Sequence, residues 1–110
     1  DAEERKSVIK ANRPYLDSAR TSAQSMLREL FGEHVYVLDP QVIHVDGTLE
    51  HRIPATIYTD NPEATKKRLQ RSMKIPEGTL TLVSAETIPL NDGSGTSIVE
   101  ATYAGSKPLH

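Results

Sequence analysis

The sequence contains no cysteine and no tryptophan, and only one phenylalanine among its 110 residues. The absence of cysteine excludes disulfide bonds, thiolate catalysis and cysteine-ligated zinc, and it leaves the cellular compartment undecided. The shortage of large aromatic residues predicts a core built mainly from aliphatic side chains. A chain of this length can form one domain with one hydrophobic core.

Long apolar runs and a strong net charge are also missing. No apolar stretch approaches the roughly 20 residues that span a bilayer, and the sequence shows no signal peptide. The formal net charge of −2 gives no overall field that would favour nucleic acid or a membrane surface. The chain begins at Asp1 rather than at Met, and we interpret it as part of a longer protein, for which a membrane-anchored parent is one hypothesis.

The stretch 33–60 predicts a β-hairpin whose turn is Asp46-Gly47, because a type I′ turn needs positive φ at both central residues. In this register Val45 pairs with Thr48, and His44 and His51 lie diagonally on one face. Pro40 and Pro54 predict a bend or bulge near Asp39–Pro40. By alternation, the expected core face carries Tyr36, Leu38, Val42, Leu49, Ile53, Ala55 and Ile57.

Two amphipathic helices flank this hairpin. The first is predicted from Pro14 to Phe31, with Gly32 as its stop. Its expected apolar stripe is Leu16, Ala19, Ala23, Met26 and Leu30, widened by Tyr15, Leu27 and Phe31. Packing of this stripe on a sheet is the main interpretation, and a coiled-coil seam is the alternative. The second helix is predicted from Pro62 to about Lys74, with Asp60 or Asn61 as its N-cap.

Residues 79–88 and 96–103 are predicted to form two further strands, joined by a loop that contains Asp92-Gly93-Ser94-Gly95. The expected fold class is α+β: an αββαββ two-layer sandwich with a four-stranded antiparallel sheet in the order 3-4-2-1 and two helices on one face, a circularly permuted ferredoxin-like arrangement. The expected organisation is a charged helical lead-in or linker over 1–13, a single domain over 14–104 and a flexible tail over 105–110.

The layout is similar to that of small modules that many membrane-bound assemblies carry beside their transmembrane parts, such as pilus-alignment and ring-building domains. The cytosolic tails of some transporters also resemble it. The resemblance covers the order of elements and no signature residues, so it implies function only by analogy of fold.

No pattern of residues indicates catalysis, a metal site or a cofactor. The two hairpin histidines lack an evident third metal ligand, so we interpret them as histidines of the sheet surface. The glycines of 92–95 do not precede a helix, as phosphate-binding glycines do, and a mobile loop is the simpler interpretation. We therefore expect a protein that is not an enzyme and binds no small-molecule substrate.

Two surfaces are candidates for binding. The basic side of the second helix could contact phosphates, although we expect no exposed aromatic residues on the last two strands to stack bases. Its residues are Lys66, Lys67, Arg68, Arg71 and Lys74. The strand over 79–88 has no charge or proline before Glu86 and is an expected unprotected edge, with Thr79, Thr81, Val83 and Ala85 as interface residues.

The leading hypothesis is a non-catalytic interaction or assembly module that self-associates or docks on a protein partner. The alternative is a nucleic-acid-binding domain that uses the basic side of the second helix.

Overall fold

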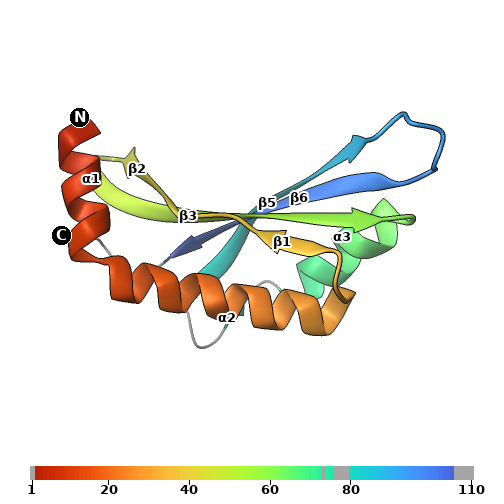
Figure 1. The fold of residues 1–110 in the computed structure, drawn as a ribbon, viewed down its shortest axis with the longest axis horizontal. Coiled ribbons are helices and arrows are strands. Elements are labelled where there is room, and N and C mark those ends of the chain that lie inside the picture. Colours follow the sequence, from red (N-terminus) through yellow and green to blue (C-terminus); the bar gives the residue numbers. More distant parts are fainter. Residues whose placement is uncertain (1, 73, 76–79, 106–110) are drawn as a thin grey trace.

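A computed structural model describes residues 2–72, 74–75 and 80–105 of the chain. Within these residues the fold is α+β, as predicted, with three helices and six strands (Figure 1). The helices are α1 (Ala2–Ala11), α2 (Arg13–Phe31) and α3 (Pro62–Arg71). The strands are β1 (Val35–Val37), β2 (Gln41–Val45), β3 (Thr48–Thr59), β4 (Lys74–Ile75), β5 (Leu80–Pro89) and β6 (Ser97–Gly105).

The strands form one antiparallel sheet in the order β1-β3-β6-β5-β4, and β2 also pairs with β3. Because β1 and β2 follow each other along the same side of β3, the six strands occupy five positions. The strands expected from the sequence take the predicted order. The short β4 was not predicted: α3 ends at Arg71 rather than Lys74, and Lys74 pairs with Thr81 as part of β4.

The hairpin turn is the one that the sequence predicts. Asp46 and Gly47 both have positive φ, 50° and 81°, and Val45 pairs with Thr48. The predicted register holds as far as Gln41, which pairs with Arg52.

Beyond Pro40 the predicted register is wrong by one residue. Val37, not Leu38, pairs with Ala55, and Val35 pairs with Ile57. Residues 38–40 lie opposite only 53–54, so the β1–β2 side carries one extra residue, as in a β-bulge. Side chains alternate along a strand, and the slip therefore buries Val35 and Val37 and exposes Tyr36 and Leu38, which the sequence placed in the core.

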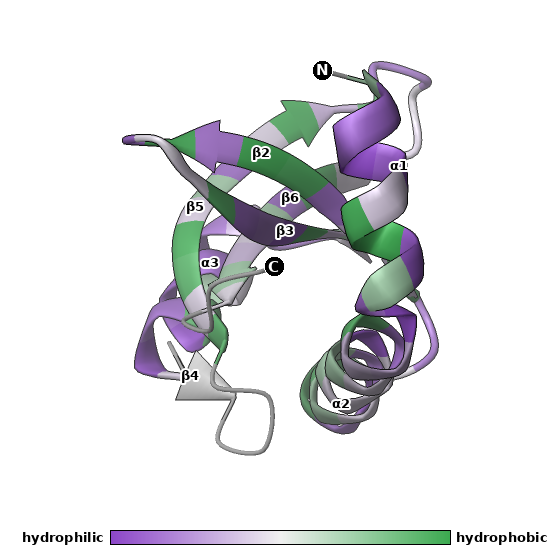
Figure 2. Ribbon diagram, turned by 90° about the vertical axis from the view of Figure 1, so that its left-hand side faces the viewer, coloured by the Kyte–Doolittle hydropathy of each residue, from purple (hydrophilic) through white to green (hydrophobic). Residues whose placement is uncertain are grey.

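The main core lies between one face of the sheet and the helices α2 and α3. It contains Ala19, Ala23 and Leu27 from α2 and Leu69 from α3, packed with buried residues of the sheet: Val35, Val37, Ile53, Ala55, Ile57, Leu80, Val99, Ala101 and Tyr103. A smaller cluster joins α1 to the hairpin through Val8, Leu16 and Val42. Figure 2 shows α2 end-on at one side of the sheet and α1 upright beside the hairpin.

The buried stripe of α2 differs from the expected one at its second half. Leu16, Ala19 and Ala23 are buried as predicted. Leu27, expected only at the margin of the stripe, is fully buried, whereas Met26 and Leu30, expected at its centre, are half-buried. Leu27 lies close to three full turns after Leu16 at about 3.6 residues per turn, so the two side chains point the same way. The expected spacing follows a 3.5-residue repeat, which drifts around a straight helix.

α3 begins as predicted. Asn61 caps it, since its Oδ1 accepts a hydrogen bond from the backbone N–H of Ala64 at 3.2 Å. Pro62 occupies the first turn, where a missing N–H has no cost. At the other end of the chain, β6 extends to Gly105, one residue past the predicted domain boundary, and 106–110 lie outside the described residues.

Candidate interaction surfaces

The face of the sheet opposite the core carries most of the exposed large apolar side chains of the described residues. We call it the open face. Tyr36 on β1, Tyr58 on β3 and Ile88 on β5 are 52%, 41% and 42% exposed. Tyr36 alternates with the buried Val35 and Val37, and Tyr58 pairs through Ile98 with Ile88 on the same face. Leu38 is similarly exposed, and its alternation with the buried Val37 places it on the same face. Val83 is also exposed, but it lies at the register shift of β5, where strand pairing does not assign it to either face. Apolar residues that gather on one face in this way mark binding surfaces more often than scattered ones do.

Strand pairing arranges the open face in rows that run across the sheet. In the first row Tyr58 pairs with Ile98, which pairs in turn with Ile88. In another row Leu38 donates its backbone N–H to Pro54 at 2.9 Å, and Pro54 pairs with Thr102. The Tyr36 ring meets the Tyr58 ring edge-on, with 5.8 Å between their centroids. The sequence predicted no exposed aromatic residues on the last two strands, which are β5 and β6. It made no such prediction for β1 and β3, where Tyr36 and Tyr58 are exposed.

A pair of carboxylates lies between these apolar rows. Glu86 and Glu100 are directly opposed across β5 and β6, and both are exposed. Within the described part of the chain neither forms an ion pair. Like charges placed opposite each other destabilise a sheet. The open face therefore combines apolar rims with a central acidic pair.

Both edges of the sheet are partly obstructed. The Arg20 guanidinium donates hydrogen bonds to the Val37 carbonyl on β1, at 3.0 and 3.2 Å. On the other side β4 pairs with the first residues of β5, and the register of β5 shifts between Leu82 and Ser84. Bulges and covering segments are devices that protect a sheet from edge-to-edge pairing.

The residues predicted for an edge interface are therefore dispersed. Thr81 is paired to β4, Val83 occupies the bulge with 51% of its surface exposed, and Ala85 is half-buried against the core. Thr79 lies outside the described residues. The expectation of a free, regular edge over this strand is wrong at its beginning, because β4 pairs there, and at Val83, because the bulge interrupts the ladder.

The basic side of α3 keeps three of its five predicted cations together. Lys67, Arg68 and Arg71 line, with Ala64, a shallow pocket of about 470 Å³. Arg68 also lies over the Phe31 ring, 5.7 Å from its centroid, which ties α3 to the end of α2. Lys66 is half-buried on the same helix. Lys74 does not belong to this helical face, since it lies in β4.

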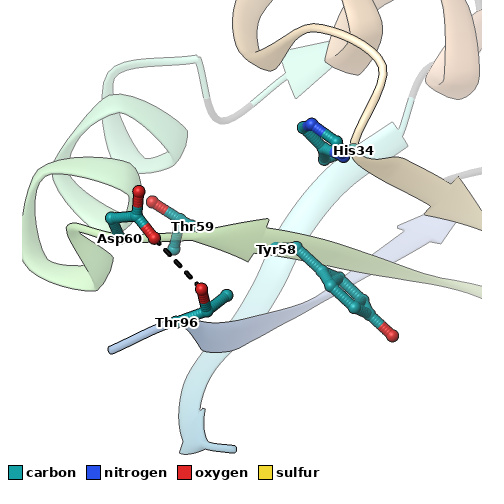
Figure 3. Close-up of a pocket in the computed structure, with 5 residues that line it drawn as sticks. All are labelled: His34, Tyr58, Thr59, Asp60 and Thr96. Carbon is teal, nitrogen blue, oxygen red and sulfur yellow. Dashed lines mark hydrogen bonds between the residues drawn. The ribbon is translucent and has the colours of Figure 1, made fainter. Parts of the chain in front are cut away.

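A second pocket, of about 320 Å³, opens at the end of the sheet and was not anticipated from the sequence (Figure 3). It is lined by His34, Tyr58, Thr59, Asp60 and Thr96. The Thr96 hydroxyl donates a hydrogen bond to Asp60 Oδ1 at 3.1 Å, and His34 lies apart from this pair. The Thr59 hydroxyl accepts bonds from the Thr65 hydroxyl and the Asn61 backbone N–H. These bonds fix the start of α3 and form no relay between a base and a nucleophile.

The two hairpin histidines have different environments, although they share a face as predicted. His44 is partly exposed, and its Nε2 lies 3.7 Å from Glu4 Oε1 of α1. His51 is fully buried, so its interpretation as a surface histidine is wrong. Its ring meets the Tyr15 ring edge-on at 5.3 Å. The described residues contain no group of three or more side chains placed to hold a metal ion.

Burial has a direct effect on the ionisation of two core side chains. It lowers the pKa of His51 below its ordinary value, and the Arg52 charge lowers that pKa further, while Glu50 acts in the opposite direction. Burial also raises the pKa of Tyr103 to about 12. Neither side chain reaches a pocket described above, so these shifts bear on stability rather than on chemistry.

The glycine-containing loop forms local turns. Asp92 Oδ1 accepts hydrogen bonds from the backbone N–H and hydroxyl of Ser94, and these bonds lower the pKa of the exposed Asp92 carboxyl. Gly93 and Gly95 both have positive φ. The loop joins two strands and precedes no helix, so it lacks the setting of a phosphate-binding loop.

No protein-family model, curated protein or solved structure matches this chain. Among the described residues, no helix is both long and apolar enough to cross a membrane. The open face, the basic side of α3 and the two pockets are therefore interpreted from their own geometry and chemistry.

Proposed function

We propose that this protein is a non-catalytic interaction module that docks a protein partner, or a second copy of itself, on the open face of its sheet. The observation that carries this proposal is the gathering of Tyr36, Leu38, Tyr58 and Ile88 on one face. Exposed tyrosines contribute strongly to interfaces because they bury a large area with few rotatable bonds. The obstructed sheet edges favour docking on the face over addition of a strand.

Two measurements test this proposal. Sedimentation velocity over a wide concentration range reports self-association, and selection from a displayed peptide library reports partner docking. We expect either association or selected binders, with amide shifts that map to Tyr58 and Ile98 in NMR spectra. Tyr36→Ser combined with Tyr58→Ser should abolish the binding, whereas Thr21→Ala on the exposed side of α2 should preserve it. A monomer whose selected binders all map elsewhere would contradict the proposal.

A second candidate function is phosphate or nucleic-acid binding on α3. The observation that favours it is the pocket of Lys67, Arg68 and Arg71, whose lining contains no acidic residue. Binding of this kind depends steeply on salt, because each neutralised phosphate releases counterions. Fluorescence anisotropy with mixed-sequence single- and double-stranded oligonucleotides would detect it. Lys67→Glu with Arg71→Glu should abolish binding, and Lys6→Glu with Lys10→Glu on α1 is the control with an equal change of charge.

The finer description of the fold belongs to the same proposal. The order of α2, two long strands, α3 and two more strands corresponds to a circularly permuted ferredoxin-like arrangement, to which α1 and the short β4 are additions. Both packing helices contribute to one core cluster, which supports this description. Superposition of an experimental structure on ferredoxin-like domains, with the connectivity permuted, would test it.

A further inference from the structure

The acidic pair at the centre of the open face indicates which chemistry a partner must bring. Glu100 is two residues from Ile98 and two from Thr102 along β6, so the carboxylates separate the Tyr58 row from the Leu38 row. Rows on one face of a strand lie about 7 Å apart. A partner that covers both apolar rows must therefore also cover Glu86 and Glu100.

Covering two carboxylates without a compensating cation is unfavourable, because they lose water and remain opposed to each other. Arg52, which alternation places on this face, is already bonded to Glu50, at 3.0 Å. The described chain thus supplies no cation to the pair, and the partner has to bring one.

We infer that the open face selects a protein segment with apolar side chains on both sides of a central Lys or Arg, and that Glu86 and Glu100 bind this cation. The inference rests on the proposed docking function and specifies its partner. Tyr58, Ile98 and Ile88 would contact one apolar side of the segment, and Leu38 with Pro54 the other. The cation would lie between the two carboxylates and relieve their repulsion.

The same carboxylates argue against two other occupants. A second copy that packs face to face around a two-fold axis brings its own acidic pair towards this one, which raises the repulsion. Single-stranded nucleic acid could stack bases on Tyr36 and Tyr58, but its phosphates would approach Glu100. Both occupants are alternatives that the experiment can distinguish.

The test uses three synthetic amphipathic peptides of one sequence, in which the residue at the middle of the apolar side is Lys, Gln or Glu. Titration calorimetry gives the Kd of each peptide, and NMR amide shifts locate it on the protein. We expect the Lys peptide to bind the open face roughly tenfold or more tightly than the Glu peptide, with the Gln peptide between them.

Two variants of the protein isolate the carboxylates. Glu86→Gln with Glu100→Gln should remove the preference for Lys, while Glu29→Gln with Glu63→Gln, at exposed helical positions, should retain it. The first variant should also self-associate more readily than the wild type in sedimentation velocity, because it keeps the apolar rows and loses the repulsion.

Three other results of these experiments would refute the inference, and each has a distinct signature. Binding to the open face with no preference for Lys leaves the docking function intact and refutes the selection of a cation. A face-to-face dimer of the wild type at neutral pH, or amide shifts on this face with a mixed-sequence oligonucleotide, identifies one of the rejected occupants. Absence of binding by all three peptides up to millimolar concentration also refutes the inference, and the displayed-library test then decides the docking function separately.

Discussion

Replacement of Gly105 by alanine should destabilise the protein through one identified contact with His51. A Cβ atom at this position would lie 2.5 Å from Nδ1 of the His51 ring, and closer still to Cε1 and Nε2. Unstrained contacts between such atoms are about 3.5–4.0 Å, so the overlap is at least 1 Å. The ring is fully buried against Tyr15 and cannot swing into solvent. Overpacking of this kind costs about 1–3 kcal/mol.

A double-mutant cycle makes this expectation specific. Urea denaturation of Gly105→Ala, His51→Ala and the double variant gives the free energy of unfolding of each. The cost of Gly105→Ala should nearly disappear when His51 is alanine, since the added methyl group then has space. Gly47→Ala is the control: its Cβ would meet nothing within 4 Å, but φ is +81°, so its cost is conformational and should not depend on His51. A Gly105→Ala protein with wild-type stability, or an equal cost in both backgrounds, would refute the reasoning.

Three further outcomes are expected. Burial lowers the pKa of His51 in the folded protein, so the unfolded chain binds the proton more readily. The free energy of unfolding should therefore decrease as the pH falls from about 6.5 towards the lowered pKa. Denaturation curves of His51→Gln should show a smaller decrease over the same pH range. Leu27→Ala should cost about 2–5 kcal/mol and Leu30→Ala clearly less, and equal losses in urea titrations would mean that both side chains are in the core. Gly47→Val should lower the melting temperature, since a β-branched residue resists positive φ, and an unchanged melt would exclude Asp46-Gly47 as a strained turn.

The elements of this fold were predictable where the local chemistry of the chain determines them. The Asp46-Gly47 turn requires positive φ at two adjacent residues, and few sequences satisfy that requirement. Asn61 and Pro62 likewise define a helix start by a cap and a missing donor. The end of α3 carried no comparable signal, and the pairing of β4 with β5, which ends the helical pattern early, is a tertiary contact.

The environment of His51 could not be predicted from the hairpin alone. Alternation placed its side chain on the core-facing side with Val42, but whether that side is covered depends on what packs at the end of the sheet. Tyr15 reaches the ring from the start of α2, and Gly105 from the end of β6 leaves space for it. These residues are far apart in sequence, and no periodic pattern relates them.

The candidate surface itself depends on a single inserted residue. A continuous register through Asp39–Pro40 would have directed Tyr36 and Leu38 into the core and their neighbours Val35 and Val37 onto the open face. The bulge exchanges the two sides: Val35 and Val37, which are β-branched and compact, fill the core beneath α2, and the larger Tyr36 and Leu38 point outwards. Two prolines predicted that the strand would be irregular there, but they did not show how many residues the irregularity would absorb. The number of residues absorbed by the bulge decides which side chains of β1 face the core, because side chains alternate with a period of two. The sequence signal that would have revealed the surface is thus the compactness of Val35 and Val37 relative to Tyr36 and Leu38, since both valines share the buried core cluster with the small residues Ala19 and Ala23 of α2.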